Sequence, residues 1–289
     1  MKKILITGAN SYVGTSFKKW VSQHPDKYSI DTISLRDEQW RENSFEGYDV
    51  VFHTVGIAHV DANPDPKMES LYYKVNRDLT IEVAQKAKND GVAQFVFMSS
   101  IIVYGDSGYI SKPRIIDKNT VPIPANFYGN SKLQAEEGIK FLETNHFKIA
   151  IIRPPMIYGK GSKGNYPKLA KVARTFPIFP NIENQRSMLH IDNLCEFIQL
   201  MIDNEESGLF FPQNSEYVKT SEMVKLIAEA HGRKIELTKV FNPILQAMGR
   251  KIGIVNKVFG NLVYDQRLSD YKDNYRVRDL RDSIIATEK

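Results

Sequence analysis

Short apolar runs alternate in the first half of the chain with longer segments whose apolar residues recur every three or four positions. The runs predict buried strands at 3–6, 50–53, 94–98 and 148–152, and the segment 30–35 is also predicted as a strand. The periodic segments predict helices at 12–21, 71–88 and 132–143. Strands covered on both faces read as continuous apolar stretches. The alternation therefore indicates an α/β fold with a doubly wound parallel sheet.

The alternation fails after Ile157, where loops rich in Gly, Pro and Lys separate short helices and the strand-like Leu209-Phe-Phe211. We therefore expect a first domain over 1–157 and a smaller mixed α/β substrate domain over 158–289, with part of 186–205 returning to the first.

Composition and charge exclude several classes of protein. The 289 residues are 42% hydrophobic and 25% charged, as in ordinary globular proteins, and the net charge of +5 is scattered along the chain. Without a basic run we expect no nucleic-acid partner, although a basic cleft would attract a polyanionic ligand. One cysteine, Cys195, rules out an internal disulfide. Because no segment is long and apolar enough to span a membrane, we expect a cytoplasmic protein without an integral membrane segment.

The six histidines show no metal-ligand spacing. His53 and His59, on or just after an apolar run, read as structural or rim residues, and we expect no metal.

Candidate chemistry centres on Tyr128 and Lys132, which share one face of a helix. A cation there favours the phenolate and would lower the tyrosine pKa from its usual value of about 10. Ser99-Ser100 adds hydroxyls, and the turn between Thr7 and Gly14 follows a strand and opens a helix, where backbone N–H groups face a pyrophosphate. This combination suits coupled proton and hydride transfer, although a lone Tyr-x-x-x-Lys also occurs on solvated helix faces.

Four motifs together resemble the extended short-chain dehydrogenase/reductases, and more narrowly their branch of nucleotide-sugar epimerases, dehydratases and reductases. They are Thr7-Gly-Ala-Asn-Ser-Tyr-Val-Gly14, Ser99-Ser100 before Val103-Tyr104-Gly105, Tyr128-Gly-Asn-Ser-Lys132 and Arg153-Pro-Pro-Met-Ile-Tyr-Gly159. The resemblance covers nearly the whole chain and implies a Rossmann sheet.

The resemblance also implies roles for single residues. Ser100, Tyr128 and Lys132 take the catalytic positions, and Tyr128 and Ser100 also contact the substrate. Met156 and Arg186 fall at substrate-binding positions, although Arg186 also reads as a surface charge. The positions implied to contact the cofactor are Gly8, Asn10, Ser11, Tyr12, Val13, Gly14, Arg36, His53, Thr54, Val55, Gly56, Asn76, Ser99, Tyr128, Lys132 and Pro155.

Three departures from the family pattern limit which reaction of the family is expected. Ser11 replaces the middle glycine of the turn, which requires a negative φ there. Ile101 and Ile102 stand where dehydratases carry Asp and Glu, so dehydration is not expected. Met156 stands where many epimerases carry an asparagine.

The cofactor preference depends on the end of the second strand. Arg36 suits a ribose 2′-phosphate and favours NADP(H) over NAD(H), whereas a shift by one residue to Asp37 would favour NAD. The stretch from 36 to 49 is also shorter than usual for the family, so a strand is reduced or lost there.

These observations favour an NAD(P)-dependent 4-keto-6-deoxy-sugar reductase acting on a UDP-sugar in surface polysaccharide biosynthesis. The alternatives are a UDP-sugar 4-epimerase with tightly bound NAD and a non-catalytic dinucleotide sensor, against which the intact Ser100, Tyr128 and Lys132 argue. The resemblance implies a homodimer joined by the helices around Thr80 and Lys132. The apolar and basic segment 239–265 reads either as substrate-domain core or as a peripheral membrane or partner surface.

Overall fold

The computed structural model describes residues 1–58, 68–106, 108, 110, 112–249 and 253–289, so His59 and Ile252 lie outside the described residues. The described chain divides into two compact units. Unit 1 contains residues 1–105, 122–154 and 194–212, and unit 2 contains 106–121, 155–193 and 213–289. The chain thus passes between the units more often than a boundary at residue 157 allows.

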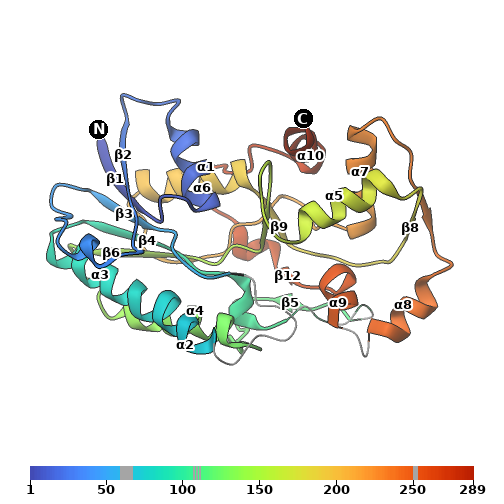
Figure 1. Ribbon diagram of the computed structural model, residues 1–289, viewed down its shortest axis with the longest axis horizontal. Coiled ribbons are helices and arrows are strands. Elements are labelled where there is room, and N and C mark those ends of the chain that lie inside the picture. Colours follow the sequence, from blue (N-terminus) through green and yellow to red (C-terminus); the bar gives the residue numbers. More distant parts are fainter. Residues whose placement is uncertain (59–67, 107, 109, 111, 250–252) are drawn as a thin grey trace. The chain divides into compact units, whose positions relative to one another are not determined.

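Unit 1 is built on six parallel strands in the order β10-β6-β4-β3-β1-β2 (Figure 1). The strands are β1 (Lys2–Thr7), β2 (Tyr28–Ile33), β3 (Val50–His53), β4 (Gln94–Met98), β6 (Lys148–Ile152) and β10 (Gly208–Phe210). Strand β10 contains most of the Leu209-Phe-Phe211 run that the sequence pattern placed in the substrate domain. That placement was wrong, because β10 pairs with β6 and completes the main sheet.

The edge of the sheet beside β2 is shortened. Between β2 and β3 the described chain forms only the 3-10 turn η1 (Glu38–Arg41), which agrees with the expected loss of a strand between 36 and 49. The buried Trp40 of this turn stacks on Phe45, and both belong to the hydrophobic cluster that packs on one face of the sheet. The parallel, helix-covered sheet confirms the doubly wound α/β fold.

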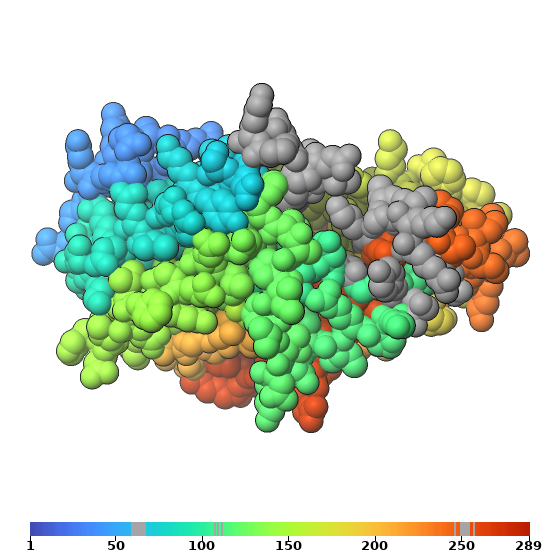
Figure 2. All heavy atoms as spheres, turned by 90° about the horizontal axis from the view of Figure 1, so that it is seen from below, coloured from blue at the N-terminus to red at the C-terminus, as the bar shows by residue number. Residues whose placement is uncertain are grey.

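Helices cover both faces of this sheet (Figure 1). Helices α3 (Leu79–Asn89) and α4 (Phe127–Lys140) bury Val83, Ala84 and Ile139 against strand residues of one face. They run beside each other on the surface, in cyan and green in Figure 2. Helix α1 (Tyr12–Val21) and most of α6 (Ile191–Asp203) lie on the other face, where Phe17 packs edge-on against Phe52 of β3.

The helix predicted at 71–88 is interrupted. The chain forms α2 (Glu69–Tyr72), then a π-helical segment, η3 (Tyr73–Asp78), and then α3. Single π turns inside α-helices are frequent at functional sites. This one contains the buried Asn76.

Unit 2 consists of paired short strands and helices around its own core. The strand pairs are β7 (Met156–Tyr158) with β9 (Met188–His190), β8 (Ile178–Pro180) with β11 (Glu236–Thr238), and β5 (Ile115–Ile116) with β12 (Val263–Tyr264). The helices are α5 (Asn165–Thr175), α7 (Thr220–Ala230), α8 (Asn242–Gly249), α9 (Gly253–Phe259) and α10 (Leu280–Glu288).

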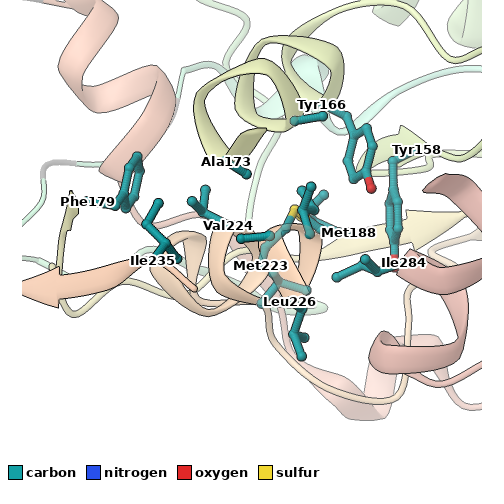
Figure 3. Packing of buried hydrophobic residues seen from close by; sticks show 14 of the residues in the cluster. Tyr158, Tyr166, Ala173, Phe179, Met188, Met223, Val224, Leu226, Ile235 and Ile284 are labelled. Carbon is teal, nitrogen blue, oxygen red and sulfur yellow. The ribbon is translucent and has the colours of Figure 1, made fainter. Parts of the chain in front are cut away.

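Figure 3 shows this core, in which Met223 and Val224 of α7 pack among side chains of β7, β9, α5 and α10. The Tyr158 and Tyr166 rings stack at 5.4 Å. The segment 239–265 is partly core, because Val255 and Phe259 are buried in this cluster, whereas Val240 and Ile244 are exposed.

Candidate active site

The turn after β1 is shaped for close approach of a phosphate. Gly8 has φ +95°, a backbone conformation that residues other than glycine rarely adopt. A Cβ on Gly8 would also lie 2.8 Å from Thr54 Oγ1. Helix α1 begins directly beyond the turn, so the N-terminus of the helix lies at the turn. Asn10, Tyr12 and Val13 lie in this turn and the first helical turn.

Ser11 is the N-cap of α1. Its φ of −71° is negative, as the replacement of glycine requires, and its hydroxyl accepts the Gly14 N–H at 2.9 Å. The same Ser11 hydroxyl bonds Thr54 Oγ1 at 2.6 Å, and Thr54 Oγ1 in turn donates to the Thr7 carbonyl at 2.7 Å. The ends of β1 and β3 are thereby tied together at the point where the strand order reverses, the usual ligand position in such sheets.

Gly56 allows two polar side chains to pack closely against the backbone after β3. A Cβ on Gly56 would lie 3.0 Å from Lys132 Nζ and 3.2 Å from Asn76 Oδ1. Asn76 bonds the chain next to Gly56, accepting the Ile57 N–H at 2.7 Å and donating to the Ile57 carbonyl at 3.1 Å. The lack of a side chain at Gly56 therefore lets Lys132 and Asn76 lie against the backbone after β3, and Asn76 ties this segment to the π-helical segment η3.

Helix α4 carries both predicted members of the Tyr-x-x-x-Lys pair. It begins earlier than the sequence pattern indicated, because Asn126 caps it by accepting the Gly129 N–H at 2.9 Å. Tyr128 therefore lies in the first turn. Lys132 lies one turn on and donates from Nζ to the Met98 carbonyl, at the end of β4, at 2.9 Å.

Ser100 lies at the end of β4 with Ser99, as expected. It caps the short 3-10 turn η4 (Ile101–Tyr104), accepting the Ile102 N–H at 3.3 Å. A side-chain hydrogen bond joins Ser100 to Tyr128. The structure thus brings Ser100, Tyr128 and Lys132 together in unit 1.

The Tyr128 pKa departs from the expected direction. Burial raises it to about 12, the Ser100 hydrogen bond opposes this, and Tyr72 adds to the rise. The expected lowering by Lys132 is not what the folded chain shows, because burial penalises the phenolate more strongly. At neutral pH Tyr128 is a protonated phenol that can donate a hydrogen bond or a proton.

Burial also lowers the Lys132 pKa, to about 8, while the Glu136 carboxylate acts against that fall. Lys132 therefore remains mostly charged at pH 7. His53 is buried and neutral, with a pKa lowered to about 3 by burial and by Lys132. It bonds Thr7 Oγ1 at 2.8 Å and Thr80 Oγ1 at 3.1 Å, which makes it a connector between β1, β3 and α3.

Arg36 is exposed and follows the end of β2. The neighbouring Asp37 caps η1, accepting the Gln39 N–H at 3.2 Å. The Asp37 carboxylate is thereby engaged in the turn, whereas the Arg36 side chain stands in solvent. Arg36, rather than Asp37, therefore has its side chain available to contact the 2′ substituent of a cofactor ribose.

The remaining predicted residues lie in unit 2. Pro155 is buried, and Met156 begins β7 and packs partly against the unit 2 core. Arg186 forms backbone bridges to Val218 and Leu262, and its Nη1 donates to the Gly260 carbonyl at 3.3 Å. Burial lowers the Arg186 pKa to about 10, so the guanidinium stays charged at neutral pH.

The sequence patterns did not single out a polar cluster behind Ser100 and Lys132. It consists of Ser99, Tyr104, Glu136 and Arg153, which hydrogen-bond one another inside unit 1. Two signals were present in the sequence: Glu136 lies one further helical turn after Lys132, and Arg153 follows directly on a buried strand.

The described part of the chain offers neither a metal site nor a membrane-spanning helix. No group of three or more His, Cys, Asp or Glu side chains there could hold a metal ion. No described helix is long and apolar enough to cross a membrane.

Comparison with known proteins identifies the family. Residues 4–210 match the NAD dependent epimerase/dehydratase family. Because this match spans more than half of the chain, the protein belongs to that family, whose members include enzymes that act on nucleotide sugars.

Two curated relatives match along most of their length. The chain is 29% identical over 288 residues to UDP-glucose 4-epimerase of Vibrio cholerae, covering 91% of this chain and 87% of that protein. It is 28% identical over 276 residues to N-acetyl-alpha-D-glucosaminyl-diphospho-ditrans,octacis-undecaprenol 4-epimerase of Escherichia coli O157:H7, covering 89% and 81%.

Solved structures share the fold. UDP-glucuronic acid 4-epimerase from Bacillus cereus in complex with NAD superposes with a TM-score of 0.74 at 16% identity, covering 98% of this chain and 96% of that chain. RMD from Pseudomonas aeruginosa complexed with NADPH gives 0.74 at 18% identity, covering 99% and 98%. At these identities the likeness concerns the fold alone.

Proposed function

We propose that the protein is an NAD(P)-dependent enzyme that acts at C4 of a diphosphate-linked sugar, and that the reaction is 4-epimerisation. The observation that carries this is the cluster of Ser100, Tyr128 and Lys132 at the carboxyl edge of the sheet, the same edge from which the Gly8 turn leaves β1. The two long-matching relatives, both 4-epimerases by name, support the choice of reaction.

The cofactor-binding residues fit a nicotinamide dinucleotide. The Gly8 turn and the α1 N-terminus would hold the pyrophosphate, and the Lys132 ammonium, packed against the backbone at Gly56, would bind the nicotinamide ribose. When bound, the nicotinamide supplies a hydride acceptor and donor.

Tyr128, Ser100 and Lys132 have different proposed roles in the reaction. The Tyr128 phenol gives a proton to the oxygen on sugar C4 when that carbon is reduced and takes one back when it is oxidised. Ser100 bonds the same oxygen and shares a hydrogen bond with Tyr128. The Lys132 charge favours the phenolate during the oxidising step, against the burial that raises the Tyr128 pKa.

A 4-keto-sugar reductase is the second candidate, and the exposed Arg36 favours it because a reductase consumes NADPH. The length of the chain does not separate the two reactions, since the chain covers 87% of an epimerase. Arg186 and the loop from Lys160 to Lys163 are proposed to bind the substrate diphosphate.

Purified protein separates the two reactions. An epimerase should retain NAD through purification and interconvert C4 epimers without net NAD(P)H consumption, as read by NMR. Net oxidation of added NADPH with a UDP-4-keto sugar would instead identify the reductase. UDP-N-acetylglucosamine and an undecaprenyl-diphosphate sugar should be compared as substrates, because both carry a diphosphate.

Tyr128→Phe tests the role of the phenol. Turnover should be lost while NADH binding, followed by fluorescence, stays close to that of the unaltered chain. Unchanged turnover in this variant would contradict the mechanism, and absence of turnover in the unaltered chain with every substrate would favour a dinucleotide sensor. The homodimer through the helices around Thr80 and Lys132, the role in polysaccharide biosynthesis and the cytoplasmic location stay predictions.

A further inference from the structure

A buried ion pair that the proposed reaction does not use lies directly behind the catalytic cluster. Glu136 of α4 is fully buried and Arg153, just after β6, is 3% exposed. Arg153 Nε donates to Glu136 Oε1 at 2.9 Å, and Arg153 Nη2 donates to Glu136 Oε2. Two parallel bonds of this kind fix the planes of both groups relative to each other.

The pair also holds the two segments on either side of Ser100. The Ser99 hydroxyl donates to Glu136 Oε1, and Arg153 Nη1 donates to the Tyr104 hydroxyl at 2.7 Å, at the end of η4. The backbone repeats this link, because the Ile101 N–H donates to the Pro154 carbonyl at 2.9 Å. Ser100 is therefore held on both sides by groups that depend on Glu136 and Arg153.

Lys132 is linked to the same cluster through helix geometry. Glu136 lies one turn after Lys132, so both side chains lie on one face of α4. The Lys132 ammonium donates to the carbonyl of Met98, the residue before Ser99. The serine end of β4 is thus held by Lys132 at one residue and by Glu136 at the next.

Stability alone is a poor reason for such a pair. Removing two charges from water costs several kcal/mol per ion, and replacing a buried pair with apolar residues of similar volume is often neutral or stabilising. The orientation that the pair imposes is a better physical reason, since catalysis is sensitive to displacements of about 1 Å.

We propose that Glu136, oriented by Arg153, is a positioning residue that sets the placement of Ser100 and of the Lys132 ammonium for the reaction at C4. This inference rests on the proposed function. The Glu136 carboxylate from α4 stabilises the Lys132 charge, and His53 from β3, whose pKa Lys132 lowers, is buried and neutral and so adds no charge of its own.

The main test replaces both charges together. Glu136→Leu with Arg153→Met removes the pair without leaving one buried charge unpaired. We expect the double variant to keep its circular dichroism spectrum and its KM, to lose about 10- to 100-fold in kcat, and to show a basic limb of the pH profile at lower pH. The basic limb moves down because Lys132 loses the carboxylate that favours its protonated form.

Two further variants complete the design. Glu136→Asp keeps the charge but draws the carboxylate back, so kcat should fall while the basic limb stays in place. This variant also keeps the proposal testable if the double variant does not fold. Lys86→Met, which breaks the ion pair between Lys86 and Asp90 on α3, is the matched control and should leave kcat and the pH profile unchanged.

The outcomes separate the two proposals. A folded double variant with unchanged kcat and unchanged basic limb would overturn the positioning role while leaving the proposed function intact, as would a Glu136→Asp variant with full kcat. If the unaltered chain turns over no sugar, the proposed function fails, and the pH dependence of NADH affinity replaces turnover as the measurement. Its basic midpoint should then fall in the double variant, and an unshifted midpoint would contradict the positioning role.

Discussion

Two glycines of unit 1 allow the cost of backbone strain to be separated from the cost of crowding. Gly8 and Gly91 both have positive φ, +95° and +79°. A Cβ on Gly91 meets nothing within 4 Å, whereas a Cβ on Gly8 would lie 2.8 Å from Thr54 Oγ1 and 3.1 Å from Val55 Cγ2. Thr54 cannot easily move away, because it bonds both Thr7 and Ser11.

The expected free energies of unfolding follow from these contacts. Gly91→Ala should lower the free energy of unfolding only by the cost of placing alanine in a left-handed backbone conformation, about 1–2 kcal/mol. Gly8→Ala adds crowding of a packed site, about 1–3 kcal/mol, for a total of about 2–5 kcal/mol. Because both glycines lie in unit 1, the two variants report on unfolding of the same unit.

Urea unfolding measures both losses on one scale, provided that the slope against denaturant is shared. NADH titration of the same samples should show weakened binding for Gly8→Ala and unaltered binding for Gly91→Ala, because only Gly8 belongs to the proposed pyrophosphate turn. Equal losses of stability in the two variants, or full NADH affinity in Gly8→Ala, would refute the reasoning.

Four further predictions concern single side chains. Ser11→Ala should lower the free energy of unfolding by about 1 kcal/mol through loss of the N-cap, as read by urea unfolding. Because the folded His53 pKa is lowered to about 3, His53 stabilises the fold above its unfolded pKa of about 6.5, and this is lost as pH falls towards 3. Between pH 7 and pH 5 the unaltered chain should therefore lose about 2 kcal/mol more than His53→Gln in urea unfolding, and parallel losses would contradict the assignment. Arg36→Ala should weaken NADPH binding about tenfold relative to NADH, whereas equal ratios would remove the argument for NADP(H). Arg186→Gln should raise the KM for a UDP-sugar and leave NADH affinity unchanged, and a normal KM would exclude Arg186 from diphosphate binding.

The strands at 50–53, 94–98 and 148–152 and the helix at 12–21 have the bounds that the sequence pattern predicted. These elements were predictable because the local sequence indicates which positions are buried, either by an uninterrupted apolar run or by apolar residues at helical spacing. The turn at Gly8 was predictable for the same reason, since backbone conformation restricts which residue can stand there. The early start of α4 was missed because the Asn126 cap lies in a run of loop-forming residues.

Contacts between distant segments decided the rest. The apolar run at 209–211 predicts a strand but not which sheet that strand joins, and only the pairing with β6 shows this. The Tyr128 pKa is set by burial and by Ser100, and the pairing of Glu136 with Arg153 joins residues from a helix and a strand end. The sequence by itself determined the strands β1, β3, β4 and β6, the glycine turn after β1 and the spacing of Tyr128 and Lys132, because those depend on neighbours along the chain. Only the tertiary structure decided the charge state and the support of the cluster, because electrostatic energies depend on what surrounds each group in space.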